Sequence, residues 1–239
     1  MRFVGADGCR WGWIWVCLTE SREWEAGVER DLCRLWAKWQ EGDLILVDIP
    51  IGLRDSSDEE RLCDREARRA IGPPRSSSVF PAPCRPALYA TGYREACRIN
   101  ERRTGRRLSR QTWNIAGKIR EADELLQSHP RARRVIREIH PEVLFWALNR
   151  GRSMMHNKRT EDGFQERLQL LERRYPGSRR IAASALGMIT RKAAGGDDVI
   201  DALAAAVTGK LGRGSYRSLP EHPERDSTGL PMEIVYYSR

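Results

Sequence analysis

The 239-residue sequence has little of what marks metal-thiolate, secreted or membrane proteins. Its six cysteines include no C-x-x-C pair, which argues against a zinc site and against a disulfide framework. No segment approaches the roughly 20 apolar residues that a membrane span needs. The first residues also lack the basic and then apolar pattern of a signal peptide. We therefore expect a cytoplasmic protein that does not bind membranes.

Charge, in contrast, is abundant and unevenly distributed. Lysine and arginine number 42 against 33 acidic residues, which gives a formal net charge of +9. The segment from Arg61 to Arg137 holds 19 basic residues, 18 of them arginine, and only seven acidic ones. Arginine suits phosphate because its planar group donates two hydrogen bonds at once. This segment predicts nucleic-acid contact, and a solvated arginine-rich helical surface is the alternative.

Hydrophobic periodicity predicts an α/β protein. The expected strands cover residues 2–6, 12–19, 24–29, 44–47, 134–140 and 232–237. The expected helices cover residues 31–40, 58–70, 93–103, 109–126, 158–175 and 197–210. This order is that of an RNase H-like fold, in which helices flank a mixed five-stranded sheet. We expect one domain over residues 1–239, with a basic helical insertion at about 58–133 between the fourth and fifth strands.

Two aspartates stand where predicted strands end. Asp7 precedes Gly8 at the break of the first strand, and Asp48 follows the apolar run of residues 44–47. The carboxyl ends of parallel strands share one edge of a sheet, where ligands collect, so both side chains can face one pocket. The alternatives are a simple Asp-Gly turn for Asp7 and a loop cap for Asp48.

A third acidic group opens the helix predicted at residues 197–210. This helix is apolar nearly all round, so Asp201 is an unusual choice for a position packed against a sheet. An unpaired buried carboxylate costs several kcal/mol, and a divalent cation would remove that cost. Helix capping is the favoured interpretation for Asp197, whereas Asp198 is assigned to the site.

The pattern Asp198-x-x-Asp201-Ala202-Leu203-Ala204 resembles the closing helix of RuvC/YqgF-like proteins, among them the RuvC-type Holliday-junction resolvases. In those resolvases two helical aspartates complete a metal site that begins with an aspartate on the first strand. Asp7 matches that first-strand position. Asp48 takes the fourth-strand position, where the resolvases carry a glutamate.

A closer resemblance covers nearly the whole chain. The residues that carry it lie in the segments Val4 to Trp13, Asp48 to Leu53, Arg75 to Pro81, Glu138 to Glu142 and Gly229 to Ile234. In these segments the chain is similar to the family called domain of unknown function 429, whose members are described as predicted RNase H-like nucleases. The resemblance implies an RNase H-like fold and a nuclease activity that is itself a prediction for the family.

The mechanism implied by this resemblance is phosphodiester hydrolysis at a two-ion site. Mg²⁺ or Mn²⁺ suits a site made only of oxygen ligands. Asp7 would bridge the ions, and Asp48 and Asp198 would each hold one. Asp201 would bind an ion or orient another ligand.

Further candidates flank these aspartates. In the segment from Glu138 to Glu142, alternate positions of a strand point to one side, so we expect Glu138, His140 and Glu142 to line the same pocket, with Glu142 as a further ligand and His140 as a proton shuttle. A histidine bonded into a strand-end turn is the alternative. Candidate phosphate contacts are Arg10, Arg75, Ser76, Ser77, Lys118 and Lys158. Ordinary surface polarity is their alternative, and for Lys158 a solvated loop is the favoured interpretation.

Two other classes stay open. One is a non-catalytic nucleic-acid-binding scaffold of the same fold, which would hold nucleic acid equally well in a chelator. The other is a phosphate-transferring enzyme of the actin-like ATPase superfamily, although the sequence lacks the Gly/Thr-rich phosphate loops of that class. The residues do not distinguish DNA from RNA. The resolvases act as dimers, which leaves a homodimer open.

Overall fold

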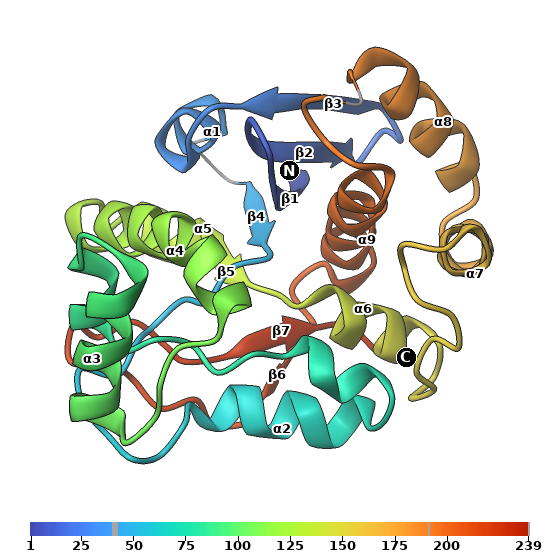
Figure 1. Ribbon diagram of the computed structural model, residues 1–239. Helices are drawn as coiled ribbons and strands as arrows, with labels where there is room; N and C mark the ends of the chain where they lie inside the picture. Colours follow the sequence, from blue (N-terminus) through green and yellow to red (C-terminus); the bar gives the residue numbers. More distant parts are fainter. Residues whose placement is uncertain (40–42, 191, 239) are drawn as a thin grey trace.

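Five strands form a mixed sheet in the computed structural model, which describes residues 1–39, 43–190 and 192–238 (Figure 1). Their order across the sheet is β3 (Trp24–Glu29), β2 (Gly12–Thr19), β1 (Arg2–Cys9), β4 (Leu44–Val47) and β5 (Ile136–Glu138). The first three strands pair antiparallel, whereas β4 runs parallel to β1 and β5 runs parallel to β4. The predicted α/β sheet, with its insertion between the fourth and fifth strands, is confirmed.

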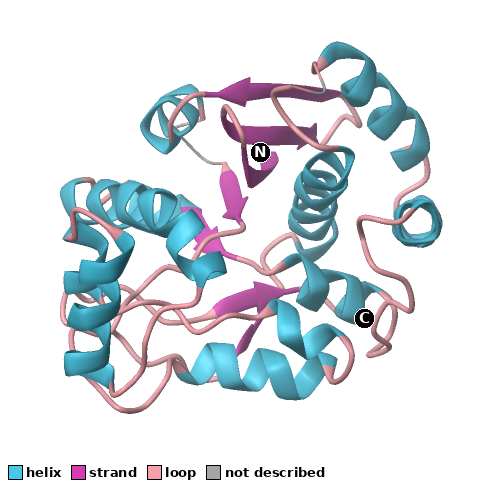
Figure 2. Ribbon diagram, viewed as in Figure 1, coloured by secondary structure: helices cyan, strands magenta, loops and turns pink. Residues whose placement is uncertain are grey.

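Helices cover both faces of this sheet (Figure 2). One face packs against α6 (Pro141–Leu148), α7 (Glu161–Arg174), α8 (Ser178–Met188) and α9 (Gly196–Gly212). The other face packs against α1 (Leu32–Lys38), α4 (Arg110–Ser128) and α5 (Ala132–Val135). The insertion also contains α2 (Leu62–Ile71), α3 (Tyr93–Thr104) and the 3₁₀ helices η1 (Arg75–Ser78) and η2 (Arg85–Tyr89).

Alternation along the strands divides the core into these two layers. In β4, Leu44 and Leu46 face the α9 side, and Ile45 and Val47 face the α4 side. Successive side chains of a strand point to opposite faces, so a strand buried on both faces is apolar throughout. Gly5 lets α9 approach β1 closely, because a Cβ there would overlap the backbone of α9.

Several boundaries differ from the sequence prediction. β1 continues to Cys9, so Asp7 lies inside the strand rather than at its break. The strand expected at 134–140 is wrong at both ends, because residues 134 and 135 belong to α5 and the strand stops at Glu138. Pro141 starts α6 because its fixed φ favours the first helical position, so Glu142 lies on a helix. α2 begins at Leu62, four residues late, and α8 was not predicted.

At the C-terminal end, β6 (Arg217–Leu219) and β7 (Ile234–Tyr236) form a separate antiparallel pair. β7 corresponds to the short strand predicted at 232–237. The helix predicted at 31–40 ends at Lys38, and Gln40 lies outside the described residues. Among the described residues, no helix has both the length and the apolar character needed to cross a membrane.

Candidate functional site

Two aspartates meet at one edge of the sheet. The parallel pairing of β1 with β4 ends at Ala6 opposite Val47, and the Asp48 backbone N donates a 3.0 Å hydrogen bond to the Ala6 carbonyl oxygen. Asp7 and Asp48 are the next residues of the two strands. Both side chains therefore lie at the carboxyl end of the parallel pair. Beyond Ala6, β1 continues to Cys9 and pairs there with β2.

Helix α9 brings a third aspartate to the same edge. Asp201 is only 1% exposed, and its Oδ1 has no hydrogen-bond partner among the described residues. Asp198 uses its Oδ2 to accept a 2.8 Å hydrogen bond from the Gly195 backbone N. Asp198 therefore makes the capping bond at the start of α9, whereas the sequence favoured Asp197 for that role.

Burial and mutual repulsion perturb these carboxyl groups. Burial, followed by the charges of Asp48 and Asp201, raises the pKa of Asp7 well above its ordinary value. Burial also raises the pKa of Asp48 to about 8 and that of Asp201 to about 6. Each carboxylate resists ionisation because it is removed from water and faces others of the same charge. The cluster therefore favours any cation that can enter it.

Lys158 supplies one such cation. Its Nζ lies 2.6 Å from Asp201 Oδ2 and 3.8 Å from Asp197 Oδ2. Burial opposes its charge, yet the carboxylates of Asp201 and Asp7 raise the pKa of Lys158 above its ordinary value. The loop between α6 and α7 therefore carries Lys158 into the cluster. Its ammonium group contacts carboxylates there, whereas the sequence favoured a solvated loop.

The donor set fits a divalent metal ion in its chemistry. The groups are carboxylate oxygens, which Mg²⁺ and Mn²⁺ prefer, and Asp201 Oδ1 is buried without a partner. Among the described residues, however, no group of three His, Cys, Asp or Glu side chains is arranged so that it could hold a metal ion. The ammonium group of Lys158 is the cation that contacts Asp201.

Glu142 and His140 lie near this edge but have other contacts. Glu142 Oε1 accepts a hydrogen bond at 2.5 Å from the Arg167 guanidinium, which is 1% exposed. Its Oε2 is buried and has no partner in the part of the chain that the structure describes. Burial lowers the pKa of His140, whose Nε2 lies 3.4 Å from the Ser78 carbonyl oxygen. Glu142 is thus half of a buried ion pair, and His140 favours its neutral form.

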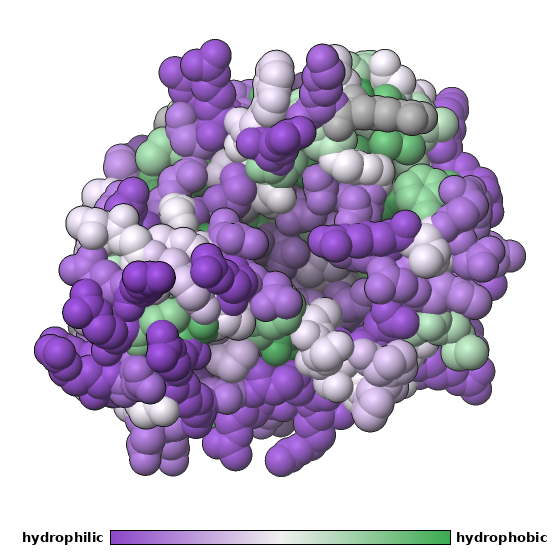
Figure 3. Space-filling view, in the orientation of Figure 1, coloured by the Kyte–Doolittle hydropathy of each residue, from purple (hydrophilic) through white to green (hydrophobic). Residues whose placement is uncertain are grey.

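The predicted phosphate contacts are dispersed. Arg10 is exposed in the β1–β2 turn, and Lys118 Nζ donates to the Gly12 carbonyl oxygen. Arg75 donates to two carbonyl oxygens of the loop that carries Lys158, at 3.1 and 3.0 Å. In η1, Ser77 bonds to a backbone carbonyl, and Ser76 is half-buried. Hydrophilic side chains surround a hollow near β4 and α9 (Figure 3).

The chain matches the model of a known protein family. Residues 5–225 match the model of a family described as "Protein of unknown function (DUF429)". The chain belongs to this family. No curated protein and no solved structure matches it. The DUF429 match runs from β1 to beyond β6, so it contains Asp7, Asp48, Lys158 and Asp201.

This DUF429 chain also contains buried arginine networks that its sequence did not reveal. Arg61, 3% exposed, lies 2.6 Å from Asp64 and 2.8 Å from Glu138, and Arg85 pairs with Asp123 at 3.0 Å. Part of the basic excess in the insertion therefore holds the fold together and does not face a ligand. The three-residue spacing of Arg61 and Asp64 was the only sequence signal, because long-range pairs leave none.

Proposed function

We propose that this protein is a metal-dependent nuclease that hydrolyses phosphodiester bonds by an RNase H-like mechanism. The observation that carries the proposal is the convergence of Asp7, Asp48 and Asp201 at one sheet edge, where burial raises the pKa of each. A buried group of like charges is unfavourable for folding and is retained where it binds a cation or performs catalysis.

Asp7, Asp48, Asp198 and Asp201 would hold Mg²⁺ or Mn²⁺ in this proposal. Bound there, the ions would lower the pKa of the attacking water and stabilise the leaving oxygen. Asp7 is central because it faces both Asp48 and Asp201. One oxygen of Asp201, Oδ1, has no partner among the described residues and would be available to an ion.

In this proposal, Lys158 would leave Asp201 when a metal ion binds to the cluster. Its ammonium group neutralises Asp201 in the metal-free protein, and it lies on a loop rather than on a helix or strand. Released from Asp201, the same group would be free to contact a substrate phosphate. His140, which burial keeps neutral, would accept or deliver a proton beside this edge.

One observation favours a second function. The contact of Lys158 with Asp201 already gives the cluster a cation, which favours a non-catalytic scaffold that binds nucleic acid without metal. Such a protein would hold nucleic acid equally well in a chelator, and an Asp7→Asn substitution would leave its stability unchanged or raise it by removing charge repulsion.

A cleavage assay tests the nuclease proposal. Wild-type protein would be incubated with single-stranded, double-stranded and branched DNA and RNA in Mn²⁺, Mg²⁺ or chelator. We expect metal-dependent cleavage that falls at least about 100-fold in Asp7→Asn, a loss typical of damage to a metal site. Asp162→Asn, an exposed position on α7, serves as the matched control and should cleave normally. Unchanged cleavage by Asp7→Asn would overturn the assignment.

A further inference from the structure

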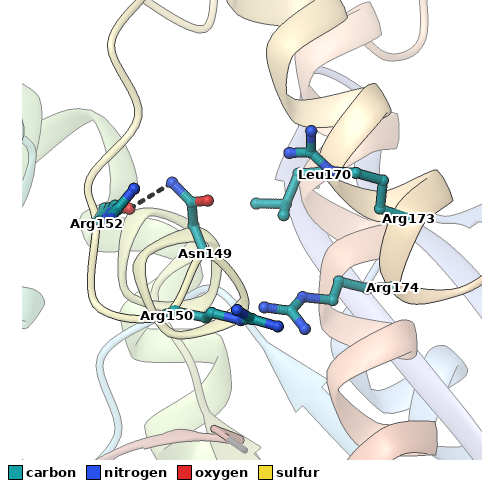
Figure 4. A pocket seen from close by; sticks show the side chains of 6 residues that line it. All are labelled: Asn149, Arg150, Arg152, Leu170, Arg173 and Arg174. Carbon is teal, nitrogen blue, oxygen red and sulfur yellow. Dashed lines mark hydrogen bonds between the residues drawn. The ribbon is translucent and has the colours of Figure 1, made fainter.

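A cavity of about 460 Å³ lies between the ends of α6 and α7, and none of the clustered aspartates lines it. Its lining consists of Asn149, Leu170 and four arginines: Arg150, Arg152, Arg173 and Arg174. Figure 4 shows Arg150 and Arg174 pointing toward one another, with Leu170 between the two segments. The charged groups that line the cavity are thus all positive.

Three of these arginines lack a partner. The side chains of Arg150, Arg152 and Arg173 are exposed, and they make no hydrogen bond or ion pair within the part of the chain that the structure describes. Arg174 is held differently, because its Nε donates to the Leu148 carbonyl oxygen. Among the described residues, the buried arginines pair with acids, whereas the charges of Arg150, Arg152 and Arg173 have no such partner there.

The nearest acids on α7 are engaged elsewhere. Glu172 accepts hydrogen bonds from the backbone N of Gly177 and Arg179, at 3.0 and 2.8 Å. Glu166 accepts from the backbone N of Met155 and His156, at 2.8 and 2.9 Å. Both carboxylates therefore stabilise neighbouring turns and do not neutralise the arginines of the cavity.

We propose that this cavity binds a ligand carrying two or more linked phosphate groups. Guanidinium groups recognise phosphate oxygens through paired hydrogen bonds, and several of them converge here from two segments. The volume falls in the range of small-molecule sites and exceeds what one phosphate fills. Among the described residues that line the cavity, only Leu170 is apolar and none has an aromatic ring for base stacking, so recognition would concern phosphates and not bases.

The position of the cavity suggests the source of the phosphates. Arg167 and Arg174 lie on one helix, and the first pairs with Glu142 beside the aspartate cluster. Seven residues of helix separate them, a rise of about 10 Å. A nucleic-acid strand at the cluster could therefore extend to the cavity, and a free polyphosphate is the other source. The cavity itself is independent of the proposed metal site.

Binding measurements on the full chain in chelator test this site without the nuclease activity. The ligands are inorganic tripolyphosphate, followed by calorimetry, and a labelled single-stranded oligonucleotide, followed by fluorescence anisotropy. The pocket variant is Arg150→Gln/Arg173→Gln. The control is Arg30→Gln/Arg180→Gln, which removes the same charge from exposed positions that do not line the cavity. Thermal melting verifies that both variants fold.

We expect the pocket variant to bind at least one ligand about tenfold or more weakly, and the control to change less than about twofold. A loss confined to the oligonucleotide would identify a strand as the source, and a loss of tripolyphosphate binding would identify a small polyphosphate. Equal losses in both variants, no loss in either, or no binding by the wild type would overturn the proposal. Because metal is absent throughout, these results do not depend on whether the aspartates catalyse cleavage.

Discussion

Replacing Asp48 by asparagine is expected to stabilise the metal-free protein at pH 8. The Asp48 side chain makes no hydrogen bond or ion pair to any described residue, so the substitution removes charge and keeps shape. Burial raises its pKa from 3.8 to about 8, with Asp201 and Glu138 adding to the rise and Lys158 opposing it. Asparagine has no such penalty because it does not ionise.

The pKa shift sets the size and sign of the effect. About 4 pKa units at 1.36 kcal/mol each give a ceiling near 6 kcal/mol. Asp48 keeps some contact with solvent, so we expect a gain of about 2 kcal/mol. Between about pH 4 and pH 8 the folded protein binds more protons than the unfolded chain, so the wild type loses stability as pH rises. The gain from asparagine is therefore absent near pH 4 and complete near pH 8.

Urea unfolding at pH 4.5 and pH 8, in chelator, measures this difference. Asp43→Asn is the matched control at the other end of β4, because Asp43 is buried and pairs with Arg2 at 2.7 Å. That control should lose about 1–3 kcal/mol at pH 8. If Asp48→Asn lowers the free energy of unfolding at pH 8, or raises it equally at both pH values, the electrostatic account of the cluster is wrong.

Three further predictions concern single contacts. Lys158→Met should tighten Mn²⁺ binding about tenfold or more in electron paramagnetic resonance titrations, because no ammonium group then competes for Asp201. Weaker Mn²⁺ binding would contradict the proposal that Lys158 leaves Asp201 when metal binds. Glu142→Gln should lower the free energy of unfolding by about 3 kcal/mol in urea, because Arg167 keeps a buried charge without its partner; an unchanged midpoint would refute this. Gly5→Ala should cost at least about 2 kcal/mol in the same assay, because the added Cβ overlaps α9; a neutral result would show that α9 can shift.

The sheet and most of its helices follow from the sequence because their signals are local. The apolar run at 44–47 and the helix after Gly195 bury side chains in patterns that the residues themselves display. Helix α8 was missed because three of its six apolar residues are alanines, which give a weak periodic signal, and because its start at Gly177 has no side-chain cap. The end of β5 was misplaced because alternation continues past Glu138 in the sequence, whereas Pro141 starts a helix.

The candidate site was only partly predictable. Asp7 and Asp48 were placed correctly at one edge because the topology of parallel strands determines where their ends meet. No local pattern could show that Lys158 contacts Asp201, since 43 residues separate them. For the same reason the sequence did not reveal that Arg75 holds the loop of Lys158 through its carbonyl groups.

A crystal soaked with Mn²⁺ and measured at an anomalous wavelength tests the central claim most directly. We expect anomalous density bounded by Asp7, Asp48, Asp198 and Asp201, as one ion or as two about 4 Å apart, with Lys158 moved away from Asp201. Density absent from this edge, with the Lys158 ammonium still 2.6 Å from Asp201, would contradict it and favour the metal-free scaffold.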